Sequence, residues 1–473
     1  MTRVLFWNIE NFALNKIFSV ALKRQRGHGG LTDAQAALAR RTVINAVNAA
    51  AQADIIVIVE VSSGDNWPNA LASQTGGMEA MVYIQNRFNN PAVVLPGGWG
   101  LVPPLYTGTG GRAETVGILY RRTNTAGTIH RYFTGPNIWT GGYGGASADP
   151  GLGLAPAAYP APVMVGAGID INAMLVPPGF GGVRAIPGGA QHNGGLNENV
   201  VAARIAFDDT FGAPVAFGGL REPFMTTFTE TNAGGVVQRD LTIFGIHSPP
   251  QGVAAANYMA TLATMQDIMG PLGATETRII GGDFNLNLFA ANGTPSGAYA
   301  PLIAGAGNYT LLVAPTAGGI PVNVDQYIGY FSTHIRGKVK TAASKFLWSD
   351  VGGAGLSDYP GYGYAGSNFV AAPFYSIDNI LVWPHQAPPY NYDTTIMNTV
   401  AGTPMNAVAM PPDNPPFGVR VLASQFGAPG GAWPAAPTAP NFPGIGGASS
   451  LTGWANYGRI RNTSDHFGIF ANV

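Results

Sequence analysis

The run Asp54-Ile55-Ile56-Val57-Ile58-Val59-Glu60 decides the fold class of this chain. A continuous β-branched run of this length is typical of a strand that is buried on both faces, and it stops at the carboxylate of Glu60. Before it, residues 32–51 combine capping-box spacing with apolar residues at helical spacing, which predicts a helix. Further upstream, the apolar strand 4–7 ends at Asn8. The order is therefore strand, polar residue, helix, strand, acid.

A second copy of this plan occurs later in the chain. The apolar strand 241–246 ends at His247, and the strand 278–282 leads into Asp283. Between them a helix is predicted, with one face formed by Tyr258, Leu262, Met265 and Met269. The recurrence indicates two similar layers, each of which presents polar side chains at its strand ends.

The remaining pattern predicts one large α/β domain. Further strands are predicted at Val116–Tyr120, Phe224–Phe228, Ile377–Trp383 and Phe467–Phe470. Alternating strands and helices followed by mostly strands favour a four-layer α/β sandwich, in which two packed mixed β-sheets are flanked by helices. We expect a single domain over residues 1–473 with long loop-rich insertions at about 134–199 and 384–463, where charges are few and proline and glycine are frequent.

Composition excludes several classes of protein. Only 10% of the residues are charged and the formal net charge is −1, so the chain is neither a coiled coil nor a basic nucleic-acid-coating protein. Any phosphate binding must come from local charges. The absence of cysteine excludes disulfides, thiolate catalysis and Cys-ligated metal sites.

Targeting signals are not visible in this sequence. No apolar run reaches the ~18–20 residues of a membrane span, and the strand predicted at 4–7 leaves no room for a signal peptide before it. We therefore expect no membrane span, and a protein that is cytoplasmic or exported by a route without such a signal. Nothing in the sequence predicts a protein partner, and we expect a monomer.

Polar side chains at the ends of apolar strands are the main functional signal. Such a group costs solvation energy unless it meets a partner, a metal or a substrate. Six positions share this placement: Asn8, Glu60, His247, Asp283 with Asn285, Asp378 with Asn379, and Asp465 with His466. Carboxylates, amides and imidazoles in one such set predict a single converging site.

The same residues resemble the motifs of the endonuclease/exonuclease/phosphatase superfamily, in their usual order. The matching stretches are Phe6–Asn11, Ile58–Val61, Gly282–Asn285, Ile377–Ile380 and Ser464–His466. Arg221-Glu222-Pro223 and Glu114 are similar to elements of the pancreatic deoxyribonuclease-like branch. The chain departs from many relatives in having Phe467-Gly468-Ile469 after the last motif, and it lacks the tryptophan that precedes Gly-Asp-x-Asn in inositol polyphosphate phosphatases.

The resemblance implies a divalent metal held by hard oxygen ligands. Glu60 is the best magnesium ligand, with Asn8 and Asp465 assisting, and Mn²⁺ or Ca²⁺ are alternatives. Asn8 also contributes to substrate binding. Arg221 is expected to bind a phosphate oxygen of the substrate, because its fork suits oxyanions.

The resemblance also implies catalytic roles. Asp283 orients or deprotonates the attacking water, and Asn285 holds a phosphate oxygen. Glu114 pairs with His247, and Asp378 pairs with His466. One imidazole then acts as base or phosphate polariser and the other as acid to the leaving group; the sequence does not assign which does which.

Three functions follow from this reading. The leading one is a magnesium-dependent phosphodiesterase that hydrolyses nucleic acid, with DNA as the preferred substrate, by in-line attack of water. The second is a phosphoesterase acting on a phospholipid head group or a small phosphorylated metabolite, and the third is a non-catalytic binding protein on the same fold. A basic strip at alternate positions is either a solvated strand face or a nucleic-acid contact; it comprises His334, Arg336, Lys338 and Lys340.

Overall fold

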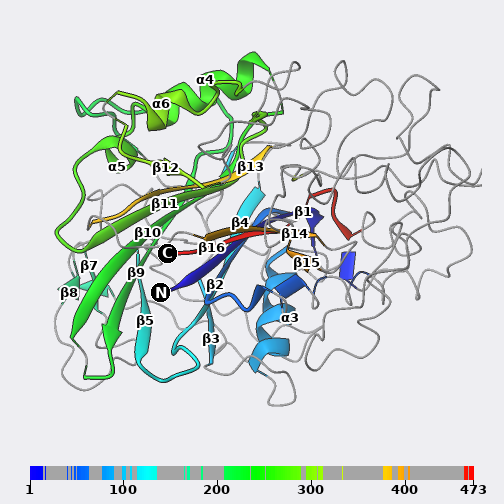
Figure 1. The fold of residues 1–473 in the computed structure, drawn as a ribbon, viewed down its shortest axis with the longest axis vertical. Helices are drawn as coiled ribbons and strands as arrows, with labels where there is room; N and C mark the ends of the chain where they lie inside the picture. The colour runs from blue at the N-terminus through cyan, green and yellow to red at the C-terminus, as the bar shows by residue number, and fades with distance from the viewer. Residues whose placement is uncertain are drawn as a thin grey trace, which may run out of the picture.

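The structure is a computed structural model, shown as a ribbon in Figure 1. It describes the parts of the chain that form the two sheets and their covering helices. The described residues are 1–13, 51–62, 77–89, 98–102, 107–108, 114–135, 207–312 without 235, 251, 289–294 and 306, 377–385, and 463–473 without 467, together with positions 16, 17, 40, 44, 47, 48 and 333 and the backbone of short strands within 164–184 and 393–404.

The first sheet has seven strands and contains both ends of the chain. Strands β1 and β2 run parallel at its centre, and antiparallel neighbours flank them on both sides. In spatial order the strands are β15 (Thr403–Pro404), β14 (Asp393–Asn398), β16 (Ile469–Asn472), β1 (Arg3–Phe12), β2 (Ile55–Ser62), β4 (Glu114–Arg121) and β3 (Trp99–Leu101).

The second sheet has six strands and repeats the parallel centre with β10 and β11. Their antiparallel neighbours are β9 on one side and β13 on the other. In spatial order the strands are β12 (Thr310–Leu311), β13 (Asp378–Trp383), β11 (Glu276–Asp283), β10 (Val237–His247), β9 (Phe224–Asn232) and β5 (Ile129–Gly135). A small third sheet comprises β6 (Met164–Val165), β7 (Gly168–Asp170) and β8 (Val183–Arg184).

Two glycines of the second sheet allow it to pack closely against the first. A Cβ added at Gly245 of β10 would lie 2.8 Å from Cγ1 of Val116 on β4. One added at Gly281 of β11 would lie 2.6 Å from the ring of Phe6 on β1. Side chains of one sheet therefore fill space that a side chain on the other would need, and the two sheets form one shared core.

Helices cover the outer faces of the two sheets, which completes the predicted four-layer sandwich. Helix α3 (Gly77–Asn89) lies on the first sheet, where Met81 occupies the space over Gly117 of β4. Helices α4 (Val253–Leu262), α5 (Gln266–Met269) and α6 (Ala300–Ile303) lie beside the second sheet. The helix predicted before β2 is described at single positions, and its apolar face, including Ile44 and Val47, is buried there.

The structure corrects the prediction of one continuous helix after His247. Helix α4 ends at Leu262, and α5 begins only at Gln266. Between them Met265 is extended (φ −70°, ψ 131°), and Gln266 N donates to the carbonyl of Asp208. A hydrogen bond to a neighbouring segment thus replaces the helical one, although Tyr258, Leu262 and Met265 are all buried as their spacing predicted.

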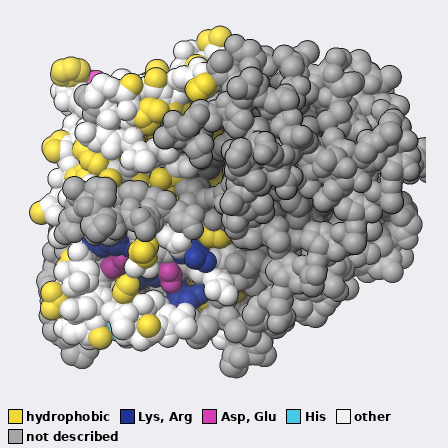
Figure 2. Space-filling view, viewed as in Figure 1, with side chains coloured by type: hydrophobic (Ala, Val, Ile, Leu, Met, Phe, Trp, Pro, Cys, Tyr) yellow, Lys and Arg dark blue, Asp and Glu magenta, His cyan; other side chains and the backbone are white. Residues whose placement is uncertain are grey.

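The outer surface of these helices is poor in charge. Helix α4 contains no acidic or basic residue, and its first residue, Val253, is 77% exposed. On the face shown in Figure 2, hydrophobic side chains gather over the region of α4 to α6. No helix among the described residues is both long and apolar enough to cross a membrane.

The two chain ends lie side by side (Figure 1), and a buried ionic cluster joins them to the second sheet. Thr2 and Val473 exchange two backbone hydrogen bonds of 2.8 Å. The Glu230 carboxylate accepts hydrogen bonds from Thr2, from Arg131 Nε (2.8 Å) and from Arg239 Nε (2.7 Å). Arg239 Nη2 also donates to the Val473 carbonyl at 2.9 Å. This cluster ties β1, β5, β9, β10 and the C-terminus together.

Most of the two predicted insertions, 134–199 and 384–463, lies outside the described residues. Within the second stretch the structure describes β14 and β15, and β14 pairs with β16 at the edge of the first sheet. Part of this proline- and glycine-rich stretch therefore extends the sheet.

Candidate active site

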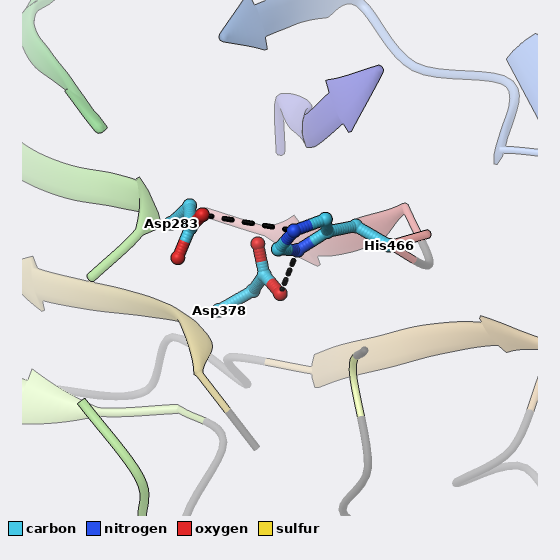
Figure 3. Close-up of side chains that lie close together, drawn as sticks. All are labelled: Asp283, Asp378 and His466. Carbon is cyan, nitrogen blue, oxygen red and sulfur yellow. Dashed lines mark hydrogen bonds and ion pairs between the residues drawn. The ribbon is translucent and has the colours of Figure 1, made fainter. Parts of the chain in front are cut away.

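Strand register brings three predicted site residues to the same end of three adjacent strands in the second sheet, β10, β11 and β13. His247 and Asp283 are partners across the parallel pair β10–β11. Asp283 and Asp378 are partners across the antiparallel pair β11–β13. The side chains of Asp283, Asp378 and His466 point toward one another in Figure 3. Asn8, which lies within β1 just before its register shift with β2, reaches the same place from the first sheet.

Asp283 lies between the two histidines. Its Oδ2 is 3.8 Å from His247 Nε2 and 3.7 Å from His466 Nε2. Asn8 Nδ2 donates to the same oxygen at 3.1 Å, and the backbone N of Asn285 donates to Oδ1 at 2.8 Å. Burial and the neighbouring Asp378 carboxylate raise the pKa of Asp283, although the two imidazoles oppose this shift. A carboxylate with a raised pKa is a better proton acceptor.

Glu114 supports His247. Glu114 Oε1 lies 2.5 Å from His247 Nδ1, and the carboxylate is almost completely buried. Burial opposes protonation of the imidazole, but the Glu114, Asp283 and Glu60 carboxylates together outweigh it, so the pKa of His247 is raised. The hydrogen bond also fixes the ring so that Nε2 faces Asp283.

Asp378 supports His466 in the same way. Asp378 Oδ2 lies 2.8 Å from His466 Nδ1, and both side chains are buried (Figure 3). Burial again opposes protonation, yet the Asp378 and Asp283 carboxylates together raise the pKa of His466. The site therefore holds two imidazoles, each backed by a carboxylate and each directed at one shared aspartate.

Two residues of the site have strained backbone: Glu60, within β2, and Asn285, just after β11. Glu60 has φ 61° and Asn285 has φ 50°, in the left-handed region that non-glycine residues rarely adopt. Glu60 lies where the pairing of β2 with β4 shifts register, and Asn8 immediately precedes a register shift between β1 and β2. Such bulges redirect side chains at the end of a strand, and strain of this kind clusters at functional sites.

The predicted metal ligands provide hard oxygen donors near the Glu114–His247 and Asp378–His466 pairs. Asp465 Oδ1 is 3.8 Å from His466 Nε2, and the Glu60 carboxylate contributes to the raised pKa of His247. The Asn8 amide oxygen accepts the backbone N–H of Glu10 at 2.9 Å and retains a second lone pair. Carboxylate and amide oxygens in a site crowded with buried acids fit a hard divalent cation.

Asp283, Asp378 and His466 also place one potential ligand atom each within 4.8 Å of one another. In this structure, however, Asp378 is hydrogen-bonded to His466. An imidazole with a raised pKa binds a proton in preference to a metal. The hydrogen bond and the raised pKa of His466 therefore favour proton transfer by this trio.

Arg221 and Asn285 are both engaged within the protein. Arg221 Nε forms a 2.8 Å ion pair with Glu114 Oε2, a contact that the sequence does not predict. Asn285 Nδ2 lies 3.2 Å from Asp283 Oδ2 and 3.1 Å from the carbonyl of Ser248. Asn285 thus connects the Asp283 carboxylate to the loop after β10.

Several supporting residues were missed in the sequence. Ser464 Oγ donates to the Asn8 carbonyl and accepts the His466 N–H, while Trp7 Nε1 donates to the His466 carbonyl at 2.9 Å. Thr333 Oγ1 accepts the backbone N–H of Asp378 at 2.9 Å. Ser464 and Trp7 stand within motifs and could have been found, whereas nothing in the sequence connects Thr333 to a strand more than 40 residues later. The basic strip from His334 to Lys340 lies outside the described residues.

Comparisons with known proteins give remote likenesses. No family model and no curated protein matches the chain. A humanized TDP2 of D. rerio has 10% identity and a TM-score of 0.36 over 100% of this chain and 99% of that chain. An endonuclease/exonuclease/phosphatase family protein from Leptotrichia buccalis has the same identity, TM-score and coverage. Beta toxin from Staphylococcus aureus has 9% identity and a TM-score of 0.35, with 100% of this chain and 99% of that chain covered.

At these identities and TM-scores, the roles of the residues must rest on the geometry of the site itself. The two-sheet fold is the one that the ordered motifs imply. The solved structures that are similar to this chain include several endonuclease/exonuclease/phosphatase proteins, the superfamily that its motifs resemble.

Proposed function

We propose that the protein is a metal-dependent phosphodiesterase that hydrolyses nucleic acid by in-line attack of water. One observation carries the proposal: the Nε2 atoms of His247 and His466 face the same oxygen of Asp283, and a carboxylate supports each ring at Nδ1. This arrangement can accept a proton at one point and donate one at another, as hydrolysis of a phosphodiester requires.

Glu60, Asp465 and the Asn8 amide oxygen would hold the metal, with Mg²⁺ as the preferred ion. A bound divalent cation supplies neutralisation of the phosphate charge and stabilisation of the departing oxygen. Among the described residues, Arg221 adds a positive charge next to Glu114, besides the two imidazoles. A phosphate dianion or diester would otherwise meet a site dominated by carboxylates.

Asp283 would orient the attacking water and accept its proton as the new P–O bond forms. As the bond to the leaving oxygen breaks, one imidazolium donates a proton to that oxygen, while the other donates a hydrogen bond to a non-bridging oxygen. Asp283 then returns the first proton to the imidazole that lost one, across a gap of 3.7–3.8 Å. The products are an alcohol and a phosphomonoester, and the residues return to their starting states.

DNA is the substrate that we propose first. The support is the resemblance of Arg221-Glu222-Pro223 and Glu114 to the deoxyribonuclease-like branch. The low charge density favours the alternative, a phosphoesterase for a phospholipid head group or a small phosphorylated metabolite, since only 10% of residues are charged.

A substrate panel tests the proposal. Purified protein is incubated with supercoiled plasmid, sphingomyelin vesicles and an inositol phosphate, each in Mg²⁺, Mn²⁺ or Ca²⁺ and each with excess chelator. We expect metal-dependent nicking of plasmid. Hydrolysis of only the lipid or the inositol phosphate would replace nucleic acid with the alternative substrate, and no hydrolysis with any metal would support the non-catalytic binding protein.

Matched histidine variants link the activity to this site. His247→Ala and His466→Ala should each lower turnover by roughly 10²–10⁴-fold, the usual contribution of a positioned acid or base. His130→Ala is the control, because His130 lies on β5 beside Thr123 and outside the site. Equal activity of all three variants would contradict the assignment.

A further inference from the structure

The Glu114 carboxylate is shared between two positively charged partners. Its Oε1 lies 2.5 Å from His247 Nδ1, and its Oε2 lies 2.8 Å from Arg221 Nε. Glu114 is 5% exposed, so both oxygens are held inside the protein. The orientation of the carboxylate that supports His247 therefore depends on Arg221 as well.

Arg221 has a buried edge and an exposed part. Its Nε atom is inaccessible to solvent and faces Glu114 as an ion pair without hydrogen-bond alignment. The side chain as a whole is 20% exposed, so the exposed surface belongs to its other atoms. A guanidinium carries five N–H donors in a planar fork, and the Nη donors can bind an oxyanion while Nε faces a carboxylate.

The residue after Arg221 holds the backbone around Glu114. Glu222 Oε2 accepts the backbone N–H of Gly108 at 2.8 Å. Gly108 follows Thr107, which exchanges two backbone hydrogen bonds with Glu114, of 2.8 and 3.0 Å. Two successive residues before β9 thus position Glu114: Arg221 contacts its carboxylate, and Glu222 holds the Thr107–Gly108 backbone that pairs with it.

We infer that Arg221 is a positioning residue that couples phosphate binding to the orientation of His247: its Nε edge fixes Glu114, and its Nη edge contacts a phosphate oxygen of the substrate. This inference rests on the proposed function and deepens it. A residue that only bound phosphate would affect substrate affinity, whereas this one also affects the chemical step through Glu114. Arg221, Glu114 and His247 should then behave as one unit.

A double-mutant cycle on kcat distinguishes the two roles. Arg221→Gln should lower kcat by about 10–100-fold in the wild-type background but by less than about 3-fold in a Glu114→Gln background, because residues that act as a unit are not additive. Arg122→Gln is the charge control, since Arg122 is an exposed neighbour at the end of β4. Equal factors in both backgrounds, or an effect of Arg221→Gln on KM alone, would overturn the inference.

A measurement without substrate separates this inference from the proposed function. His247 Nδ1–H should give a low-field imidazole proton resonance in the NMR spectrum, identified by its loss in His247→Gln. Arg221→Gln should shift this resonance and Arg122→Gln should leave it in place. If the protein hydrolyses no phosphoester, the proposed function fails while this shift still tests the link to Glu114. An unshifted resonance in folded Arg221→Gln would refute that link whether or not the protein is active.

Discussion

Asp283 and Asp378 are direct register partners across strands β11 and β13, so two buried carboxylates lie side by side at one sheet edge. Asp378 is hydrogen-bonded to His466, and Asp283 faces the other nitrogen of the same ring. The imidazole therefore separates the two negative charges. Removing the charge of Asp378 alone should therefore lower the pKa of both His466 and Asp283.

Asp378→Asn is expected to lower turnover by roughly 10²–10⁴-fold with little change in fold, because the amide cannot stabilise a protonated His466. It also removes a like charge that raises the pKa of Asp283. Plasmid-nicking rates and thermal unfolding provide the measurement. Asp209→Asn is a matched control, since Asp209 caps an exposed turn through an Oδ1 that asparagine retains. Equal rates for both variants would count against the role of Asp378.

Under the proposal that Glu60 binds the metal, function and stability compete at this residue. Its φ of 61° costs a non-glycine residue about 1–2 kcal/mol. Glu60→Gly should relieve this strain, so that the melting temperature in chelator stays level or rises, while Mg²⁺ binding measured by calorimetry is lost. A large fall in melting temperature, or Mg²⁺ binding equal to that of wild type, would contradict the proposed role.

The cluster around Glu230 should control acid stability. Burial favours the neutral acid, but Arg131 and Arg239 outweigh it and lower the pKa of Glu230 to about 2, from 4.5. The unfolded chain thus binds the proton more readily, and the stabilisation is complete above pH 4.5 and is lost as the pH falls toward 2. Glu230→Gln should cost about 3–5 kcal/mol at pH 7, because it leaves two buried guanidinium groups unpaired. Urea unfolding at pH 7 tests this, and a loss below about 1 kcal/mol would refute it.

Asp267 should have the opposite pH dependence. Burial raises its pKa from 3.8 to about 6, and neither carboxylate oxygen accepts a hydrogen bond from another described residue. The native state therefore binds the proton more readily, and stability falls as the pH rises from about 4 to 6. Asp267→Asn should raise stability by about 1–3 kcal/mol at pH 7.5 and much less at pH 4.5. An equal difference between variant and wild type at both pH values would exclude this explanation.

The sequence predicted the centre of each sheet and the polar residues at its strand ends. The β-branched run 55–59 and the apolar strand 241–246 have the pattern of buried strands. The polar residues that follow them, Glu60 and His247, belong to the candidate site. These buried strands predicted a sandwich of two sheets with a common core, and the structure confirms the four-layer sandwich. Strands at the sheet edges were harder to predict. Strand β5 contains His130 and Arg131, and buried Arg131 is paired with Glu230 and donates to Thr2 and to the Arg121 carbonyl.

Long-range side-chain contacts account for most of what the sequence did not predict. The ion pair of Arg221 with Glu114 joins residues more than 100 positions apart, and no local pattern distinguishes it from phosphate binding. The break between α4 and α5 depends on a backbone hydrogen bond to Asp208, which hydrophobic periodicity does not encode. The bulge at Glu60 likewise arises from the pairing of β2 with β4.

The most direct measurement of the central claim is a single-turnover reaction of the protein with plasmid DNA in ¹⁸O-labelled water and Mg²⁺, followed by mass spectrometry of the products. We predict that each product phosphate carries one ¹⁸O atom, and that Asp283→Asn or removal of Mg²⁺ abolishes the incorporation. Unlabelled products from the wild-type protein, or full incorporation by Asp283→Asn, would contradict water attack at this site.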